Sequence, residues 1–190
     1  MPGTLPNMPA KRKSRTAGRA RRSTPSGLPP GFGTVTPYLT VEGGLAALEF
    51  YERAFGAREL RRNVTPDGKL IHGRVKIGSS IVMLSDHFPG SDLSSPAAIG
   101  TTTVTLHVYA KNVDALWDRA VAAGAKVAMP LENQYWGERY GVLIDPFGHR
   151  WSLSTPVKMS RAEMEAKRKE AEASFARGEH PSRESRYGDA

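Results

Sequence analysis

Cysteine is absent from the 190-residue sequence. Its absence excludes a disulfide framework, a thiolate nucleophile and a zinc site with cysteine ligands. The sequence also lacks any apolar run as long as a membrane span or the hydrophobic region of a secretory signal. From these absences we expect a cytoplasmic protein with no membrane contact.

Acidic residues are missing from residues 1–30, although this segment holds seven of the 27 basic residues. Residues 31–190 contain 20 basic and 19 acidic residues, so the net charge of +8 comes mainly from the first segment. Few large apolar residues accompany these charges, and the composition predicts a disordered basic arm over residues 1–32. The arm either contacts nucleic-acid phosphates weakly, through the basic residues from Lys11 to Arg22, or acts only as a solvated tail.

The remainder of the sequence nearly repeats itself. Residues 36–57 and residues 105–125 each read as a short alternating strand followed by an amphipathic helix that ends in Gly-Ala. Strand-like segments around a glycine turn follow each copy. The pattern predicts an α+β domain over residues 33–157, built from two β-α-β-β-β units at 34–87 and 101–157. We expect the ligand site where the two units face each other.

Several local signals complete this prediction. Pro37 favours an edge position for the first strand, because proline cannot donate to a strand ladder. The turn at residues 145–149 is expected to leave His149 exposed. Ser160 and Glu163 have the spacing of a capping box, which predicts a charged helix within residues 158–190 that ends near Gly178.

Five segments carry a resemblance to a known family. They are FYERAFGA at 50–57, PDGKLIHGRVKIG at 66–78, VMLSD at 82–86, LHVYAKNVDALWDRAVAAGA at 106–125 and ENQYWGERYGVLIDPFGHRWSL at 132–153. On these segments the chain resembles the vicinal oxygen chelate superfamily of glyoxalases, dioxygenases and bleomycin resistance proteins, and more narrowly its PhnB-like branch. The resemblance implies that the two units curl into a cup-shaped mixed β-barrel with helices outside and the ligand within. It also implies a homodimer.

Metal-dependent members of that superfamily place ligands on the first and last strand of each unit. Alignment of the two repeats puts Tyr38, Val82, His107 and Ser152 at these positions. Only His107 is a good ligand for a divalent metal, whereas a catalytic site normally needs about three protein ligands. We therefore expect no metal cofactor, and a metal-dependent lyase, isomerase or dioxygenase is the alternative.

Polar residues on the expected inner face of the cup are candidate site residues. His107 and Tyr38 are the candidate catalytic pair, since an imidazole near its ordinary pKa can transfer protons. Ser152, which the repeat alignment sets opposite Val82, is a candidate ligand-binding residue. His72 and Arg74 either join the same pocket as ligand-binding residues or lie on a solvated face.

The loop sequence YWGER at residues 135–139 is a further candidate for ligand binding. Trp136 offers a flat apolar wall and an N–H donor, while Glu138 and Arg139 can bind a ligand or each other. The alternative is a structural turn with a packed tryptophan and a surface ion pair.

These observations predict a protein that binds a small polar ligand without a divalent metal, and they leave open whether it is an enzyme of the lyase or isomerase type. A drug-sequestering protein of the bleomycin-resistance type is one alternative. A nucleic-acid-associated protein that acts through the basic arm is another.

Overall fold

The computed structural model describes residues 27–178. The predicted nucleic-acid contact between Lys11 and Arg22 and the first 26 residues of the predicted arm (1–32) lie outside the described range, which begins within that arm at residue 27. The end of the expected C-terminal tail, residues 179–190, also lies outside it.

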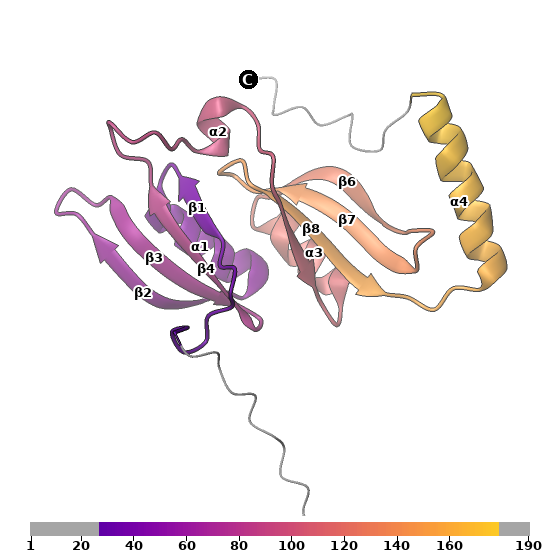
Figure 1. The fold of residues 1–190 in the computed structure, drawn as a ribbon, viewed down its shortest axis with the longest axis horizontal. Coiled ribbons are helices and arrows are strands. Elements are labelled where there is room, and N and C mark those ends of the chain that lie inside the picture. Colours follow the sequence, from indigo (N-terminus) through magenta and orange to yellow (C-terminus); the bar gives the residue numbers. More distant parts are fainter. Residues whose placement is uncertain (1–26, 179–190) are drawn as a thin grey trace, which may run out of the picture. The chain divides into compact units, whose positions relative to one another are not determined.

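The first unit contains one helix and four strands (Figure 1). Its elements are β1 (Tyr38–Val41), α1 (Gly44–Phe55), β2 (Arg58–Val64), β3 (Leu70–Ile77) and β4 (Ser80–Asp86). The strands form a sheet in the order β1-β4-β3-β2. Strand β1 runs parallel to β4, and the other neighbours are antiparallel, so the sheet is mixed.

The second unit repeats this arrangement. Its elements are β5 (Thr105–Tyr109), α3 (Val113–Ala122), β6 (Lys126–Asn133), β7 (Glu138–Ile144) and β8 (Arg150–Pro156). They form a mixed sheet in the order β5-β8-β7-β6. A short helix, α2 (Pro96–Ile99), lies between the units, and α4 (Arg161–Ala176) follows them. The predicted α+β fold of two β-α-β-β-β units with a C-terminal helix is confirmed.

Within residues 27–178, the two sheets do not share a hydrogen-bonded strand pair. Strands β1 and β5 are each the edge of their sheet, which confirms the edge position indicated by Pro37. The hydrogen bonding therefore describes two four-stranded sheets, and the backbone groups along one side of β1 and of β5 have no strand partner within this range.

Each unit packs its helix on one face of its sheet. In the first unit Leu48 of α1 lies over Gly73, where an added Cβ would come within 3.3 Å of the leucine side chain. In the second unit Trp117 of α3 lies over Gly141, where an added Cβ would come within 2.5 Å of the indole ring. The same device, a glycine under a large side chain, thus brings the helix close to the sheet in both units.

A buried carboxylate joins the two units. Asp145, in the turn before β8, accepts hydrogen bonds from the Tyr51 hydroxyl of α1 at 2.9 Å and from the Trp151 indole at 2.8 Å. Its other oxygen accepts the backbone N–H groups of Phe147 and His149. Burial raises the pKa of Asp145 above its ordinary value, and these four donors satisfy the carboxylate.

His149 strengthens the same junction. The expectation that its side chain is exposed is wrong, since it is only 8% exposed. Its Nε2 lies 3.1 Å from the carbonyl oxygen of Thr40 on β1, so this nitrogen carries the hydrogen and donates it. Burial lowers the pKa of His149, which favours the neutral ring in the fold.

The predicted capping box of α4 is confirmed. The Ser160 hydroxyl accepts the Glu163 N–H at 3.2 Å, and the Glu163 carboxylate accepts the Ser160 N–H at 2.7 Å. Helix α4 buries none of its residues, in keeping with its high content of charged side chains. Among residues 27–178, no helix has the length and apolar character needed to span a bilayer.

Candidate functional site

Four polar side chains meet on the face of the second sheet that points away from α3. His107 lies on β5, Ser152 and Ser154 on β8, and Glu138 on β7. The register pairs His107 with Ser152, and alternate residues of a strand share a face, so Ser154 lies on the same side. Glu138 comes from the start of the neighbouring strand β7 and reaches Ser154. Three strands thus bring these groups together from distant parts of the sequence.

The four groups form a directed chain of hydrogen bonds. Ser154 Oγ donates to Glu138 Oε2 at 3.1 Å. His107 Nε2 lies 3.5 Å from the same Ser154 oxygen, and His107 Nδ1 lies 2.7 Å from Ser152 Oγ. Because the Ser154 hydrogen is used on Glu138, we assign the imidazole hydrogen to Nε2, and Ser152 donates to Nδ1. The imidazole is therefore held in one tautomer between two hydroxyls, with a carboxylate at one end of the chain.

Aromatic rings surround this polar cluster. The His107 ring is stacked with Tyr140 at a centroid distance of 6.0 Å and meets the edge of Tyr109 at 4.4 Å. Trp136 lies 5.5 Å from Tyr140, and its indole N–H donates to Glu138 at 3.2 Å. Tyr109 is 66% exposed and Trp136 43% exposed, which leaves their faces open to a ligand.

The Glu138 carboxylate accepts hydrogen bonds from several side chains of this cluster. Besides Ser154 and Trp136, it interacts with the Tyr109 hydroxyl, and this hydrogen bond together with the carboxylate charge raises the pKa of Tyr109. Tyr109 is therefore a neutral phenol that stays a hydrogen-bond donor through the physiological pH range. We name His107, Ser152, Ser154, Glu138 and their aromatic neighbours Tyr109, Trp136 and Tyr140 the His107 cluster.

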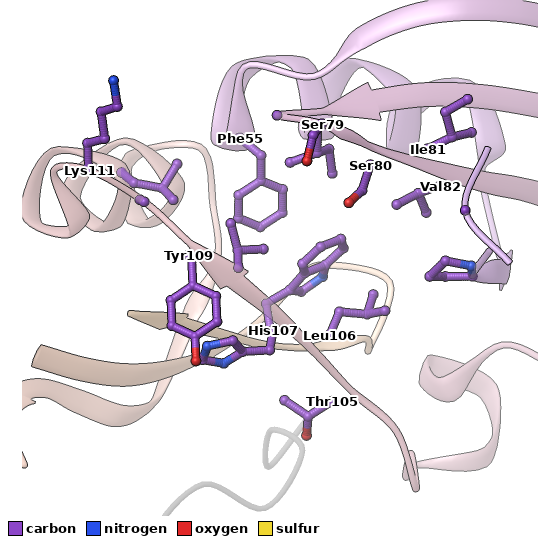
Figure 2. Close-up of a pocket in the computed structure, with 18 of the residues that line it drawn as sticks. Phe55, Ser79, Ser80, Ile81, Val82, Thr105, Leu106, His107, Tyr109 and Lys111 are labelled. Atoms are coloured by element: carbon purple, nitrogen blue, oxygen red, sulfur yellow. The ribbon is translucent and has the colours of Figure 1, made fainter. Parts of the chain in front are cut away.

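A cleft of about 920 Å³ runs along β5 (Figure 2). The second unit contributes β5 and the start of α3, and the first unit contributes Phe55 and the turn between β3 and β4 with Ser79 and Ser80. Figure 2 shows His107 and Tyr109 side by side at the β5 wall of this cleft. The cleft lies between the two units, where the repeat predicted a ligand site, and of the eight predicted site residues His107 is the one that lines it.

A second polar cluster lies on the first sheet. The Tyr38 hydroxyl is 3.0 Å from His72 Nδ1, and Arg74 Nε donates to His72 Nε2 at 2.9 Å. Since Nε2 accepts, the imidazole hydrogen is on Nδ1 and is donated to the tyrosine oxygen. Burial, followed by the charges of Arg74 and Arg61, lowers the pKa of His72.

The predicted site residues therefore divide into two groups. His107, Ser152, Trp136 and Glu138 come together on the second sheet, and Tyr38, His72 and Arg74 come together on the first. Arg139 joins neither group, because it makes an ion pair with Asp114 of α3 at 2.7 Å. The proposed catalytic pair of His107 and Tyr38 is thus divided between the two clusters.

The sequence pattern placed Tyr109 on the strand face of His107, but sequence reasoning missed Tyr140 and Ser154 as members of the His107 cluster. The signal for Ser154 was present, since it is two residues from Ser152 on β8. Tyr140 comes from the neighbouring strand β7 and faces Ser154 in the register. Its position depends on strand pairing, which the sequence pattern did not supply.

The strand register corrects one member of the repeat alignment. His107 faces Ser152 in the second unit, and Tyr38 faces Met83 in the first. Met83 is therefore the structural counterpart of Ser152, whereas Val82 is buried in the core. The four positions are Tyr38, Met83, His107 and Ser152.

The sequence profile of the Glyoxalase/Bleomycin resistance protein/Dioxygenase superfamily matches residues 34–153, which include both units. The chain belongs to this superfamily. An uncharacterized protein of Mycobacterium tuberculosis (strain ATCC 25618 / H37Rv) is 47% identical over 127 residues, which cover 65% of this chain and 75% of that protein. Protein YjdN of Escherichia coli (strain K12) is 25% identical over 141 residues, covering 63% of this chain and 93% of that protein.

Two solved structures are similar to this chain in fold. TioX from Micromonospora sp. ML1 is 29% identical with a TM-score of 0.52, and the match covers 67% of this chain and 100% of that chain. The PhnB protein from Bacillus cereus is 20% identical with a TM-score of 0.53, covering 65% of this chain and 99% of that chain. The likeness to the PhnB protein, at this identity, shows the fold alone.

The glyoxalase superfamily contains metal-dependent enzymes, which hold their metal at these four strand positions. In this chain the positions offer one imidazole, one phenol, one thioether and one serine hydroxyl, of which only His107 suits a divalent metal. Among the described residues, no group of three or more His, Asp or Glu side chains converges to hold a metal ion. The residues at these positions therefore do not fit a catalytic divalent site.

Proposed function

We propose that this protein binds a small polar ligand at the His107 cluster. The observation that carries the proposal is the convergence of one imidazole, two serine hydroxyls and one carboxylate from three strands. Small-molecule sites combine a few positioned polar groups with apolar and aromatic walls. The exposed rings of Tyr109 and Trp136 supply such walls.

The adjoining cleft supports the same proposal. Its volume of about 920 Å³ lies at the upper end of the range of roughly 300–1,000 Å³ that is usual for ligand sites. His107 and Tyr109 belong both to the cleft wall and to the polar cluster. A ligand seated along β5 can therefore reach the imidazole while its apolar part contacts Phe55 and Leu106.

The geometry of the cluster is also suited to proton transfer. The chain from Ser152 through His107 and Ser154 to Glu138 holds a histidine in one tautomer, close to a carboxylate that stabilises a transient positive charge. This supports a lyase or isomerase in which His107 Nε2, whose contact with Ser154 is long at 3.5 Å, exchanges a proton with the ligand. Ser152 is only 2% exposed, so it orients the imidazole and does not act as a nucleophile.

A sequestering role of the bleomycin-resistance type is the second candidate. The observation that favours it is the series of aromatic side chains at the cluster, from Tyr109 and His107 to Tyr140 and Trp136. Such rings bind a planar ligand by stacking and need no chemistry. The proposed placement in the PhnB-like branch rests on the residue resemblance in the five segments between residues 50 and 153.

The test uses two histidine variants of the full chain. His107→Ala removes the centre of the cluster, and His87→Ala is a matched control, because His87 bonds to the Leu93 carbonyl outside the cluster. Binding of bleomycin and of a panel of small phenolic and heteroaromatic compounds is measured by calorimetry, and conversion of each compound is followed by mass spectrometry. We expect a compound whose affinity falls about tenfold or more in His107→Ala and is unchanged in His87→Ala.

The two candidate roles give different outcomes in the same experiment. Turnover that is lost in His107→Ala identifies an enzyme, while stoichiometric binding without turnover identifies a sequestering protein. A compound that binds with equal affinity to wild type and His107→Ala would show that the ligand site lies elsewhere.

We further propose that the protein is a homodimer. The unpaired edges of β1 and β5 support this, since an edge strand presents free backbone N–H and C=O groups to another chain. The side chains next to β5 are unusually exposed for apolar residues, with Val104 at 61% and Tyr109 at 66%. A second copy that covers this edge also encloses the open side of the cleft.

A further inference from the structure

Basic side chains face each other across β2 and β3 in the first sheet. The register sets Arg61 opposite Arg74 and Arg58 opposite Lys76. Like charges directly opposite each other on neighbouring strands destabilise a sheet. An anion bound beside these two pairs would offset the repulsion between their positive charges.

No acidic side chain of the protein supplies such a negative charge within the described residues. The nearby Glu59 forms its ion pair with Arg62 at 2.9 Å. None of the ion pairs within residues 27–178 includes Arg61 or Arg74. The Arg61–Arg74 pair therefore has no acidic partner within residues 27–178, and its positive charge is available to an anionic ligand.

Arg61 and Arg74 each use only one of their N–H groups in a hydrogen bond with another described residue. Arg74 uses Nε on His72 at 2.9 Å, and the Phe32 ring lies 5.3 Å from its guanidinium carbon. Arg61 uses Nε on Asn63 at 3.5 Å. The terminal NH₂ groups of both guanidiniums have no hydrogen-bond partner among residues 27–178.

Tyr38 adds a third donor. Its oxygen accepts the hydrogen of His72 Nδ1, so its own hydroxyl hydrogen is directed elsewhere. His72 thereby links Tyr38 and Arg74 into one array on the face of the first sheet. The array contains two guanidiniums and a phenol, all of them donors.

We propose that Arg61, Arg74 and Tyr38 form a binding site for a small oxyanion. Planar guanidinium groups donate in pairs to phosphate, sulfate or carboxylate oxygens, and such charge-assisted bonds are stronger than neutral ones. The site is separate from the His107 cluster and stands whether or not that cluster binds a ligand. It gives the first sheet an anion-recognition role.

The site also couples anion binding to the protonation of His72. Tyr38, Arg74 and Arg61 are the titratable or charged groups that face this ring from β1, β3 and β2. The ionisable residue of β4, Asp86, is held by the backbone N–H groups of Gly43, Gly44 and Leu70. A bound anion offsets the two arginine charges, so it raises the pKa of His72, and by linkage the anion binds more tightly as pH falls.

The experiment titrates the full chain with sodium sulfate, which remains a dianion across the pH range used. Backbone amide shifts of β2 and β3 are followed by NMR at constant ionic strength, which separates this site from binding elsewhere on the chain. We expect saturable shifts in wild type, with an affinity reduced about tenfold or more by Arg61→Gln or Arg74→Gln. Arg62→Gln is the matched control, since it removes the same charge from an arginine paired with Glu59.

A second variant and a second readout keep the test independent of folding. Tyr38→Phe removes one hydroxyl and should weaken sulfate binding severalfold while the amide spectrum stays that of the folded chain. The pKa of His72, measured from its ring resonances, should rise on saturation with sulfate. Acetate, with a single charge, should bind more weakly than sulfate.

Three results would overturn the proposal. They are the absence of saturable shifts on β2 and β3, equal affinities in Arg74→Gln and Arg62→Gln, and shifts produced by an oligonucleotide but not by sulfate. The last result would assign these arginines to nucleic-acid contact instead of a small oxyanion.

Discussion

Asp145 shows how one side chain can hold two repeated units together. Its carboxylate accepts four hydrogen bonds, among them the Tyr51 hydroxyl from the first unit and the Trp151 indole from the second. Burial and the nearby carboxylate raise the pKa of Tyr51 well above its ordinary value, so the phenol remains a donor. The junction between the units thus depends on a negative acceptor at one position.

Replacing Asp145 by asparagine should destabilise the protein. The amide NH₂ cannot accept the donors that now reach the carboxylate, and at least one of them becomes buried and unsatisfied. We expect a loss of about 2–4 kcal/mol in the free energy of unfolding, measured by urea denaturation. The control is Asp114→Asn, whose exposed ion pair with Arg139 should contribute less than about 1 kcal/mol. Equal losses in the two variants would contradict this role of Asp145.

Individual residues also show how much of the candidate site could be predicted from the sequence. Trp136, Glu138, His107 and Ser152 were all chosen from the sequence, and the structure brings them into one cluster. Arg139 was chosen with Glu138 as its neighbour, but successive residues of β7 point to opposite faces, and Arg139 pairs with Asp114 instead. Adjacency in the sequence was therefore a poor guide to which side chains share a site, and a spacing of two residues was a better guide.

At the scale of elements, the repeat predicted helices and strands well but not their exact register. Alternation of apolar residues and the capping signals are local, so they were sufficient to locate β3, β5 and α4. The error at Val82 arose from turn length, because β3 and β4 are separated by two residues and β7 and β8 by five. Alignment of Gly78 with Gly148 ignores this difference in turn length, so every later residue of β4 is shifted. Met83, and not Val82, is therefore the counterpart of Ser152.

The contact of α3 with its sheet allows a test of the packing device shared by the two units. Gly141→Ala places a Cβ 2.5 Å from the Trp117 ring and 2.9 Å from the Leu131 backbone, which forces a shift of both. We expect destabilisation of about 1–3 kcal/mol by thermal or urea unfolding. Trp117→Leu copies the Leu48 and Gly73 pair of the first unit and should recover part of the loss when combined with Gly141→Ala. A double variant no more stable than Gly141→Ala would show that the indole is not the cause.

At the scale of the whole molecule, both sheets keep a polar face and, in the described range, unpaired edge strands, among them β1 and β5. The described residues place the His107 cluster on one sheet and the Arg61–Arg74 pair on the other. The polar groups of each cluster therefore come from a single unit, while the cleft beside the His107 cluster is lined by both units. The repeat supplies a polar sheet face twice. Divergence of the side chains placed an imidazole and a carboxylate on the face of the second sheet. It placed two guanidiniums on the face of the first sheet.

Dimer formation along β5 is the last prediction, and it can be tested at one exposed valine. Val104 precedes β5 and is 61% exposed, while Val127 lies on β6, the opposite edge of the same sheet, and is 44% exposed. If a second copy covers β5, Val104→Asp buries a carboxylate at the interface, which is strongly unfavourable without a partner. Light scattering coupled to size-exclusion chromatography should then give the monomer mass of 20.7 kDa for Val104→Asp. Wild type and Val127→Asp should both give about twice that mass, since neither disturbs the β5 edge. A monomeric wild type, or a dimer that persists in Val104→Asp and is lost in Val127→Asp, would place the interface elsewhere or remove it.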